Sequence, residues 1–363
     1  MDLIPSPKRI SDTAANVFDV FVGGGVADLR PTPASIIDEA PQRTIYRYRL
    51  PHARKARGAP VLLVPPLAAP ASCFDLRRGC SMAEHLLEQG HPTYLLDYGA
   101  ISFSDRDLGL EHWIEDVLPQ AIETVSADSG RVPIQLVGWC LGGIFSLLAV
   151  AANELPVRAV ATVASPFDFR QVRLMAPIAA LAQITGGRVV SALYRALGVA
   201  PAPVVEAGYK LAGFDKYLTR PLVMAQHMDD RDFLAQLEAV DVFMGNMLAY
   251  PGRTFGQLYH RFFIVNELAQ GRLELPSGEV DLANVRVPVL VVAGDGDGIA
   301  PKAAVQHVVD LLPNAPHVRY ETAPGGHLGV LAGRAARRTT WKYLDEFLSQ
   351  DDELAGELPA AAA

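Results

Sequence analysis

Two kinds of segment alternate along the first half of the chain. Short, largely aliphatic runs occur at Val61–Val64, Ile134–Val137 and Ala159–Val163. Between them lie Met82–Glu88 and Trp113–Val125, which carry apolar residues at helical spacing. Short apolar runs are typical of strands buried in a parallel sheet. Strands that alternate with helices predict an α/β fold, a mostly parallel sheet with helices on both faces.

The alternation stops in the middle of the chain and then resumes. Residues 169–261 are rich in Ala, Leu and Met and are broken by several prolines, so we interpret them as an inserted helical cap. Strand-like runs return at Val289–Val292 and Val318–Tyr320, and a last helix is expected over Ala335–Phe347. The apolar run Leu174–Leu197 is interpreted as the core of the cap and not as a membrane-binding surface.

The two ends of the chain have weaker patterns. An apolar patch predicts a short helix at Val17–Val22, and Ile36–Ile37 and Thr44–Arg49 predict two antiparallel strands. The acidic, alanine-rich C-terminal end is interpreted as a disordered tail. Within the core, a further strand is expected at Thr93–Leu96. The expected organisation is an N-terminal segment (1–34), an α/β core (35–168 and 262–348), a helical cap (169–261) and a tail (349–363).

Composition excludes several classes of protein. The chain has 363 residues and a net charge of −8, which argues against nucleic acid as a partner because phosphate binding needs a basic face. Its three cysteines lack Cys-x-x-Cys spacing, which indicates a reducing compartment and neither a disulfide framework nor a zinc site. There is no signal-peptide pattern and no run of 18 or more apolar residues, so we expect a cytoplasmic protein without a transmembrane segment.

The most informative chemical motif is Gly138-Trp139-Cys140-Leu141-Gly142, which joins a predicted strand to a helix-forming stretch. A strand, a tight turn with glycines and a helix form a nucleophile elbow, which presents one side chain at the mouth of a sheet. Cysteine there suits thioester exchange, because a thiolate is a strong nucleophile and a good leaving group. An isolated cysteine is more often a small buried hydrophobe, so the motif needs catalytic partners.

A cysteine nucleophile needs a base, and the base needs an orienting carboxylate; in this kind of fold the acid and then the histidine follow the nucleophile. The chain offers Asp295 and Asp297 in a glycine-rich turn after a buried strand, and His327 between glycines further on. Counting from Gly294, the pattern Gly-x-x-Asp selects Asp297, whereas Asp295 is expected to cap the turn. The predicted triad is Cys140, Asp297 and His327.

The predicted oxyanion hole consists of two backbone N–H groups. One belongs to Leu141, the residue after the nucleophile. The other should lie just past the strand Val61–Val64, where Pro65 and Pro66 have no N–H. The second donor is therefore expected at Leu67 or a close neighbour.

Other residues of reactive type are interpreted as structural. The glycines of 294–298 do not indicate a nucleotide fingerprint, because they come late in the chain and Pro301 follows. Packing is the expected role of two further cysteines, Cys73 and Cys80. A structural or solvated position is expected for three histidines, His112, His227 and His260.

The motifs together resemble those of polyhydroxyalkanoate synthases. Gly-Trp-Cys140-Leu-Gly-Gly, Asp297-Gly-Ile-Ala-Pro and Gly-Gly-His327 are similar to that family's catalytic motifs. Leu-Leu-Val-Pro-Pro-Leu near the start of the core and Tyr259-His-Arg-Phe-Phe-Ile-Val-Asn-Glu-Leu after the cap are also similar. The length most resembles the short class III catalytic subunit. The chain departs from the family at Asp297-Gly298, where the family commonly has Asp-His, and it matches least over residues 170–250.

The resemblance implies an α/β-hydrolase fold and an acyltransferase that polymerises 3-hydroxyacyl-CoA. Cys140 would carry the acyl group as a thioester, His327 would activate the thiol and then the hydroxyl of the next unit, and Asp297 would orient the histidine. The resemblance implies coenzyme A thioesters as substrates, with no metal or redox cofactor. It also implies a companion synthase subunit, a homo-oligomer, and association with polymer granules or lipid bodies.

Two other functions remain open from the sequence. The same fold and triad could serve a synthase-like hydrolase acting as a thioesterase, a lipase or esterase, or a polymer depolymerase, if the cap admits water. A non-catalytic protein that binds lipid or granule surfaces could keep the fold, although an intact triad argues against it.

Overall fold

The computed structural model describes residues 7–49, 56, 58–172, 198–212 and 214–356. The predicted apolar cap run Leu174–Leu197 lies outside the described residues, as do residues 357–363 of the predicted tail. No helix in the described part is long and apolar enough to span a bilayer.

An eight-stranded sheet forms the centre of the protein, in the order β1-β2-β6-β3-β7-β8-β13-β14. The six strands from β6 to β14 run parallel, and β2 pairs antiparallel with both β1 and β6. The central strands are buried because both of their faces are covered, which explains their aliphatic sequences. The strand bounds are Ala34–Ala40 (β1), Arg43–Tyr48 (β2), Val61–Val64 (β3), Thr93–Asp97 (β6), Ile134–Trp139 (β7), Val157–Val163 (β8), Val289–Gly294 (β13) and Val318–Ala323 (β14).

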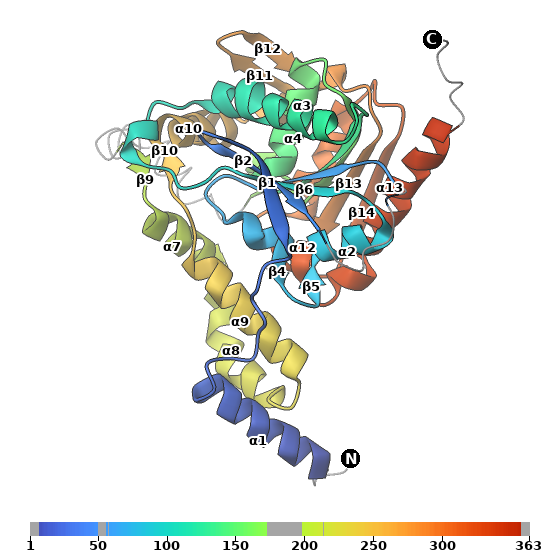
Figure 1. Cartoon of the computed structure of the whole chain (residues 1–363). Helices are drawn as coiled ribbons and strands as arrows, with labels where there is room; N and C mark the ends of the chain where they lie inside the picture. The colour runs from blue at the N-terminus through green and yellow to red at the C-terminus, as the bar shows by residue number, and fades with distance from the viewer. Residues whose placement is uncertain (1–6, 50–55, 57, 173–197, 213, 357–363) are drawn as a thin grey trace.

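Helices cover the two faces of this sheet (Figure 1). On one face α3 contacts α4, and α4 packs on β7 and β8. On the other face α2 contacts α13, which packs on β8, β13 and β14. The helix bounds are Met82–Gln89 (α2), Leu118–Asp128 (α3), Leu141–Ala152 (α4), Lys302–Gln306 (α11), Gly329–Ala332 (α12) and Thr340–Gly356 (α13), and a π-helical turn, His112–Val117, precedes α3.

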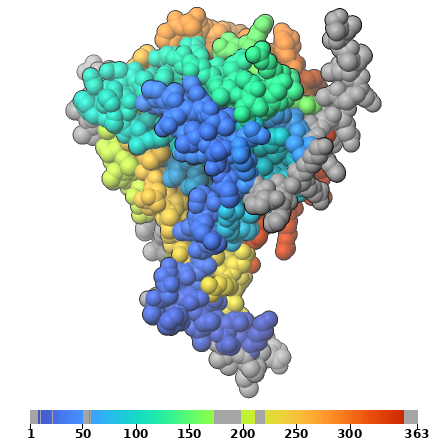
Figure 2. All heavy atoms as spheres, viewed as in Figure 1, coloured from blue at the N-terminus to red at the C-terminus, as the bar shows by residue number. Residues whose placement is uncertain are grey.

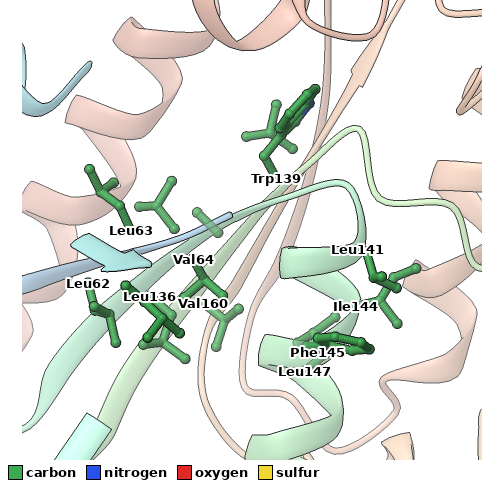
Figure 3. Packing of buried hydrophobic residues seen from close by; sticks show 14 of the residues in the cluster. Leu62, Leu63, Val64, Leu136, Trp139, Leu141, Ile144, Phe145, Leu147 and Val160 are labelled. Atoms are coloured by element: carbon green, nitrogen blue, oxygen red, sulfur yellow. The ribbon is translucent and has the colours of Figure 1, made fainter. Parts of the chain in front are cut away.

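The hydrophobic core lies between the sheet and these helices. Figure 3 shows Val64 of β3, Leu136 of β7 and Val160 of β8 near Phe145 and Leu147 of α4. All five side chains are fully buried. The α/β-hydrolase fold class expected from the sequence is confirmed by this sheet with its covering helices.

Between β8 and β13 the described chain leaves the sheet as helices that project from the core (Figures 1 and 2). Here lie α7, α8 and α9, then a short helix, α10, and a π-helical segment. Two short strands, β9 and β10, pair with each other at the side of the core. The bounds are Val199–Ala200 (β9), Ala202–Ala212 (α7), Phe214–Gln226 (α8), Arg231–Gly245 (α9), Tyr250–Pro251 (β10), Gly252–Gln257 (α10) and Leu258–Val265 (π-helical).

A cluster of ion pairs attaches α9 to the core. Asp232, in the first turn of α9, accepts from Arg77 at 2.6 Å, and it lies 3.0 Å from both Arg334 and Arg337. The Arg77 side chain is only 6% exposed, whereas Asp232 is 40% exposed, so the carboxylate joins a buried arginine of the core to two arginines nearer the surface. The start of α9 is therefore fixed relative to the sheet.

The structure corrects the expected bounds of two helices and adds two hairpins. The first helix, α1, spans Pro7–Phe21, so the prediction of Val17–Val22 was wrong about its start. The last helix runs over Thr340–Gly356, so it begins later than predicted and extends into the segment expected to be disordered. Sequence patterns also missed two short hairpins, formed by Asp75–Arg77 (β4) with Cys80–Ser81 (β5) and by Arg272–Leu275 (β11) with Gly278–Asp281 (β12).

The start of α1 was missed because its partners are distant in sequence. Asn16 donates to the carbonyl of Met228 at 2.9 Å, and Asp19 accepts from Arg231 at 2.5 Å. These contacts place the N-terminal helix against the end of the helical projection (Figure 1). In the expected N-terminal segment, residues 1–34, α1 contacts the helices between β8 and β13, whereas Asp28 and Thr32 form hydrogen bonds with the core at Arg78 and Asp75.

Candidate active site

Cys140 lies in the turn between β7 and α4, in a backbone conformation that few side chains adopt. Its φ is 53° and its ψ is −121°. A non-glycine residue with positive φ is strained and persists only where its surroundings hold it, which is common at functional sites. The Cys140 N–H donates to the carbonyl of Val163 on β8 at 2.9 Å. This is the geometry of a nucleophile elbow.

The glycines of the motif allow the turn to be this tight. A Cβ atom on Gly142 would lie 2.1 Å from the carbonyl oxygen of Val64, and one on Gly138 would lie 2.5 Å from the Cα of Gly143. Both contacts involve backbone, which cannot move aside cheaply. The motif therefore needs glycine at both positions, so that α4 can begin against the end of β3.

Asp297 and His327 are joined by a buried hydrogen bond. Asp297 follows β13, and its Oδ2 lies 2.8 Å from Nδ1 of His327. Its Oδ1 accepts the backbone N–H groups of Ile299 and Ala300, both at 2.8 Å. The two side chains are 0% and 6% exposed, respectively. The carboxylate is thus fully used: one oxygen holds the turn and the other holds the imidazole.

The environment of His327 favours its protonated form. Burial alone would lower its pKa, but the negative charge of Asp297 and the interaction with the Cys140 side chain raise it from 6.5 to about 10. Within the described part of the chain, Nε2 of His327 is buried without a nitrogen or oxygen partner. The ring therefore has one nitrogen held by Asp297 and the other facing Cys140, which is the arrangement that stabilises the imidazolium formed when the thiol gives up its proton.

Asp295 occupies a different environment from Asp297. Its side chain is 47% exposed and pairs with Lys302 at 3.0 Å. Its backbone N–H donates to the carbonyl of Ala323 at the end of β14. Of the two carboxylates considered from the sequence, the structure brings Asp297 to the histidine and leaves Asp295 at the surface.

The predicted oxyanion donors lie on either side of the contact between β3 and α4. Leu141 is the first residue of α4, so its N–H has no intrahelical acceptor. Leu67 is buried just past β3, and its N–H makes no backbone hydrogen bond to any described residue. The close approach of Gly142 to Val64 and Pro65 brings the two segments together.

Sequence reasoning missed three aromatic residues at the site. Trp139 donates from Nε1 to the backbone carbonyl of His327 at 3.1 Å, and the two rings are 5.1 Å apart. Trp139 also faces Phe243 of α9, with ring centroids 6.2 Å apart. Its position next to the nucleophile was the only signal in the sequence. The indole of Trp139 therefore contacts both the loop that carries His327 and helix α9, next to the turn that carries Cys140.

The other two are tyrosines from the segment expected to form the cap. The ring of Tyr209 on α7 lies 6.4 Å from that of His327. Burial first, and then the neighbouring Cys140, raise the pKa of both Tyr209 and Tyr250 above the usual value. Both phenols therefore stay neutral, and they lie near the nucleophile as aromatic side chains that keep a hydroxyl able to form hydrogen bonds.

The remaining cysteines and histidines are placed away from this centre or are buried in packing. Burial raises the pKa of the Cys73 and Cys80 thiols, which makes them poor nucleophiles. His112 pairs with Asp116 at 3.5 Å. Within the described ranges, no group of three or more His, Cys, Asp or Glu side chains is arranged to hold a metal ion.

Comparisons with known proteins agree with the fold. A family model described as the alpha/beta hydrolase fold matches residues 59–182. Among solved structures, alpha/beta hydrolase domain-containing protein 10 from mouse superposes with a TM-score of 0.52 at 16% identity, covering 88% of this chain and 99% of that one. A DcsB complex with a substrate analogue gives 0.54 at 17% identity, with 88% and 99% covered. At these identities the likeness concerns the fold alone.

Curated proteins similar to this chain are named as poly(3-hydroxyalkanoate) polymerase subunits PhaC. The protein from Haloferax mediterranei is 24% identical, over 97% of this chain and 69% of its own length. Those from Synechocystis and Allochromatium vinosum are 25% and 26% identical, over 88% of this chain and 85% and 90% of theirs. The resemblance to polyhydroxyalkanoate synthases that the motifs indicated is thereby confirmed along nearly the whole chain.

Proposed function

We propose that this protein is an acyltransferase that polymerises 3-hydroxyacyl-CoA into polyhydroxyalkanoate, with Cys140 carrying the acyl group. The observation that best supports this is an elbow cysteine beside a buried His327–Asp297 pair, in a chain similar to curated poly(3-hydroxyalkanoate) polymerase subunits. A sulfur nucleophile suits the substrate, because exchange between two thioesters is nearly balanced in energy. An oxygen nucleophile would instead form a more stable ester that must later be broken.

In the loading step the sulfur of Cys140 attacks the thioester carbonyl of the substrate. His327 accepts the thiol proton on Nε2, and Asp297 stabilises the imidazolium through Nδ1. The N–H groups of Leu67 and Leu141 are the proposed donors to the tetrahedral oxyanion. The bond from carbon to the coenzyme sulfur then breaks, and His327 returns the proton to that sulfur. The products are acyl-Cys140 and free coenzyme A.

In the elongation step the 3-hydroxyl group of an incoming 3-hydroxyacyl-CoA attacks the acyl-Cys140 thioester, so the lengthened chain is carried by that unit's coenzyme A and can be loaded onto Cys140 again. His327 takes the hydroxyl proton as the new ester bond forms, and it returns this proton to the departing sulfur of Cys140. One ester bond is formed and one thioester bond is broken, so the chain grows by one unit and the thiol is regenerated. No metal or redox cofactor takes part in this proposal.

Water in place of the hydroxyl would give hydrolysis, which is the second candidate function. The indole of Trp139 and the ring of Tyr209 lie beside His327, and Tyr250 lies near Cys140, so the centre has aromatic neighbours. Aromatic surface lowers the local activity of water and favours transfer to an alcohol. A companion synthase subunit, a homo-oligomer and association with polymer granules in the cytoplasm complete the proposal.

Incubation of purified protein with 3-hydroxybutyryl-CoA tests this function. Release of thiol together with insoluble polyester is expected, and both should be lost in Cys140→Ala. Stoichiometric formation of free 3-hydroxybutyrate would establish hydrolysis and refute polymerisation. Thiol release that persists in Cys140→Ala would refute the assignment of the nucleophile. If no hydroxyacyl-CoA releases thiol but a lipid ester is cleaved, the second candidate function, hydrolysis, is favoured.

A further inference from the structure

A polar cavity lies where the chain returns from the helices α7 to α9 to the core. Its volume is about 420 Å³. It lies next to the β9–β10 pair and α10, which Figure 1 shows at one side of the core. Its walls carry an excess of basic side chains, namely Arg106, Arg253, Arg261 and His260, with one lining carboxylate, Asp107.

The backbone fixes two of these arginines next to each other. The N–H of Arg253 donates to the carbonyl of Arg106 at 2.9 Å, and the N–H of Thr254 donates to the carbonyl of Leu108 at 3.0 Å. Thr254 in turn accepts from Nε1 of the buried Trp113 at 2.8 Å. The wall that carries Arg106 and Arg253 is therefore anchored to the core.

Nearby carboxylates orient the guanidinium groups without using all of their donors. Arg253 pairs with Glu111 at 2.7 Å, and Arg106 lies 3.5 Å from Asp107. Arg261 lies 3.7 Å from Glu267, beyond hydrogen-bond distance, and its Nη1 is buried without a partner among the described residues. Arg106 and Arg253 also donate from Nη1 to the carbonyls of Phe103 and Asp107, both at 3.2 Å. Since each guanidinium has five N–H donors, some of them remain available to a ligand.

We propose that this cavity binds the phosphate groups of the coenzyme A thioester. Planar guanidinium groups bind phosphate oxygens through paired, charge-assisted hydrogen bonds. Gly252, one of the lining residues, follows Tyr250 by two positions, and Tyr250 is near enough to Cys140 for that thiol, after burial, to raise its pKa. The pantetheine arm separates the thioester from the phosphates, so phosphate binding here can leave the thioester at the thiol. This inference rests on the proposed function for its choice of ligand.

Kinetics with two substrates test the proposal. The first is 3-hydroxybutyryl-CoA, and the second is the N-acetylcysteamine thioester of the same acid, which lacks phosphates. In Arg106→Gln and in Arg253→Gln, KM for the coenzyme A substrate should rise about tenfold, the effect of one charge-assisted hydrogen bond, with kcat nearly unchanged. The truncated substrate should be used as well as by the wild type. Arg30→Gln is the matched control, because this exposed arginine pairs with Asp28 outside the cavity.

Salt and the pattern of losses distinguish binding from a structural effect. Added NaCl should raise KM for the coenzyme A substrate in the wild type and have less effect in the variants, since it screens the arginine charges. An equal loss of kcat/KM with both substrates would show a structural role and overturn the proposal. An unchanged KM in both arginine variants would also overturn it.

A binding experiment separates this proposal from the proposed chemistry. Calorimetry with Cys140→Ser should show binding of adenosine 3′,5′-bisphosphate, weakened about tenfold when Arg253→Gln is added. If the bisphosphate binds but the wild-type protein transfers no acyl group, the proposed function is wrong and the phosphate site stands. If the wild-type protein transfers acyl groups but Arg253→Gln does not weaken bisphosphate binding, the proposed function stands and the phosphate site is wrong. Inorganic phosphate that binds as tightly as the bisphosphate would overturn the assignment to the coenzyme.

Discussion

Asparagine in place of Asp297 replaces one carboxylate oxygen by an NH₂ group and tests the geometry of the proposed site directly. Oδ1 of Asp297 accepts two backbone N–H groups, and Oδ2 accepts Nδ1–H of His327. The amide of asparagine has one acceptor oxygen, which the two backbone donors will retain because they are fixed in the turn. Its NH₂ group then faces Nδ1. Nδ1 of His327 must then accept a hydrogen bond, so the ring proton moves to Nε2. With Nε2 protonated, His327 can no longer take a proton from Cys140.

The expected loss is large because both the tautomer and the charge are wrong. In serine-protease triads the same replacement lowers kcat about 10⁴-fold, or roughly 5 kcal/mol of activation free energy. The structure indicates an effect of similar size. The Asp297 charge is the largest contribution that raises the pKa of His327, from 6.5 to about 10, and without it the buried imidazolium has no counter-charge. We therefore expect Asp297→Asn to lower kcat by about 10³- to 10⁴-fold.

The assay is the initial rate of thiol release from 3-hydroxybutyryl-CoA, with near- and far-ultraviolet circular dichroism to show that the variant is folded. Asp295→Asn is the control, because Asp295 is half exposed and pairs with Lys302 at the surface. Its rate should remain within a few-fold of the wild type. A folded Asp297→Asn that keeps more than a tenth of the rate, or an Asp295→Asn that loses as much as Asp297→Asn, would refute the reasoning.

Three further predictions concern the packing and charge of the same centre. Trp139→Phe leaves the buried carbonyl of His327 without its donor, so the free energy of unfolding in urea should fall by about 1–3 kcal/mol, with kcat reduced more than KM is raised; unchanged stability would contradict the role of the indole. Gly142→Ala places a methyl group against the backbone oxygen of Val64, so the variant should lose about 1–3 kcal/mol of stability and most of its acylation by radiolabelled substrate, and a fully active variant would contradict the tight turn. Because the folded-state pKa of His327 is raised from 6.5 to about 10, its pair with Asp297 stabilises the fold fully below about pH 6.5 and less as pH rises through 10. The excess unfolding free energy of the wild type over Asp297→Asn should therefore shrink between pH 6 and pH 10, and a constant difference would contradict the raised pKa.

The sequence predicted the sheet well because its signals are local. The runs that form β3, β7 and β13 are aliphatic because both of their faces are buried. The glycines around Cys140 mark a turn in which any larger residue would collide with the backbone. The choice of Asp297 over Asp295 also followed from a local pattern, and the structure places Asp297 at the histidine. Each of these features depends on a few consecutive residues.

The features that were missed depend on contacts between distant parts of the chain. Trp139 reads as one more apolar residue until its indole is seen to donate to His327, 188 residues further on. Tyr209 lies in a helical stretch whose sequence gives no sign of which residue will face the nucleophile. The arginines at 106 and 253 are ordinary surface charges in the sequence and become neighbours only through a backbone hydrogen bond between them. Periodicity and motifs carry no information on such pairings.

The order of the proposed triad along the chain has a consequence for how the protein is made. Cys140 precedes His327 by 327 − 140 = 187 residues, and β8 pairs with β13 only after the intervening segment has been synthesised. At about 5–20 residues per second, the nascent polypeptide carries its thiol for roughly 10–40 seconds before the histidine leaves the ribosome's active centre. Throughout that interval the sulfur has no base beside it. A nascent chain that has not yet been extended to His327 therefore lacks the proposed base.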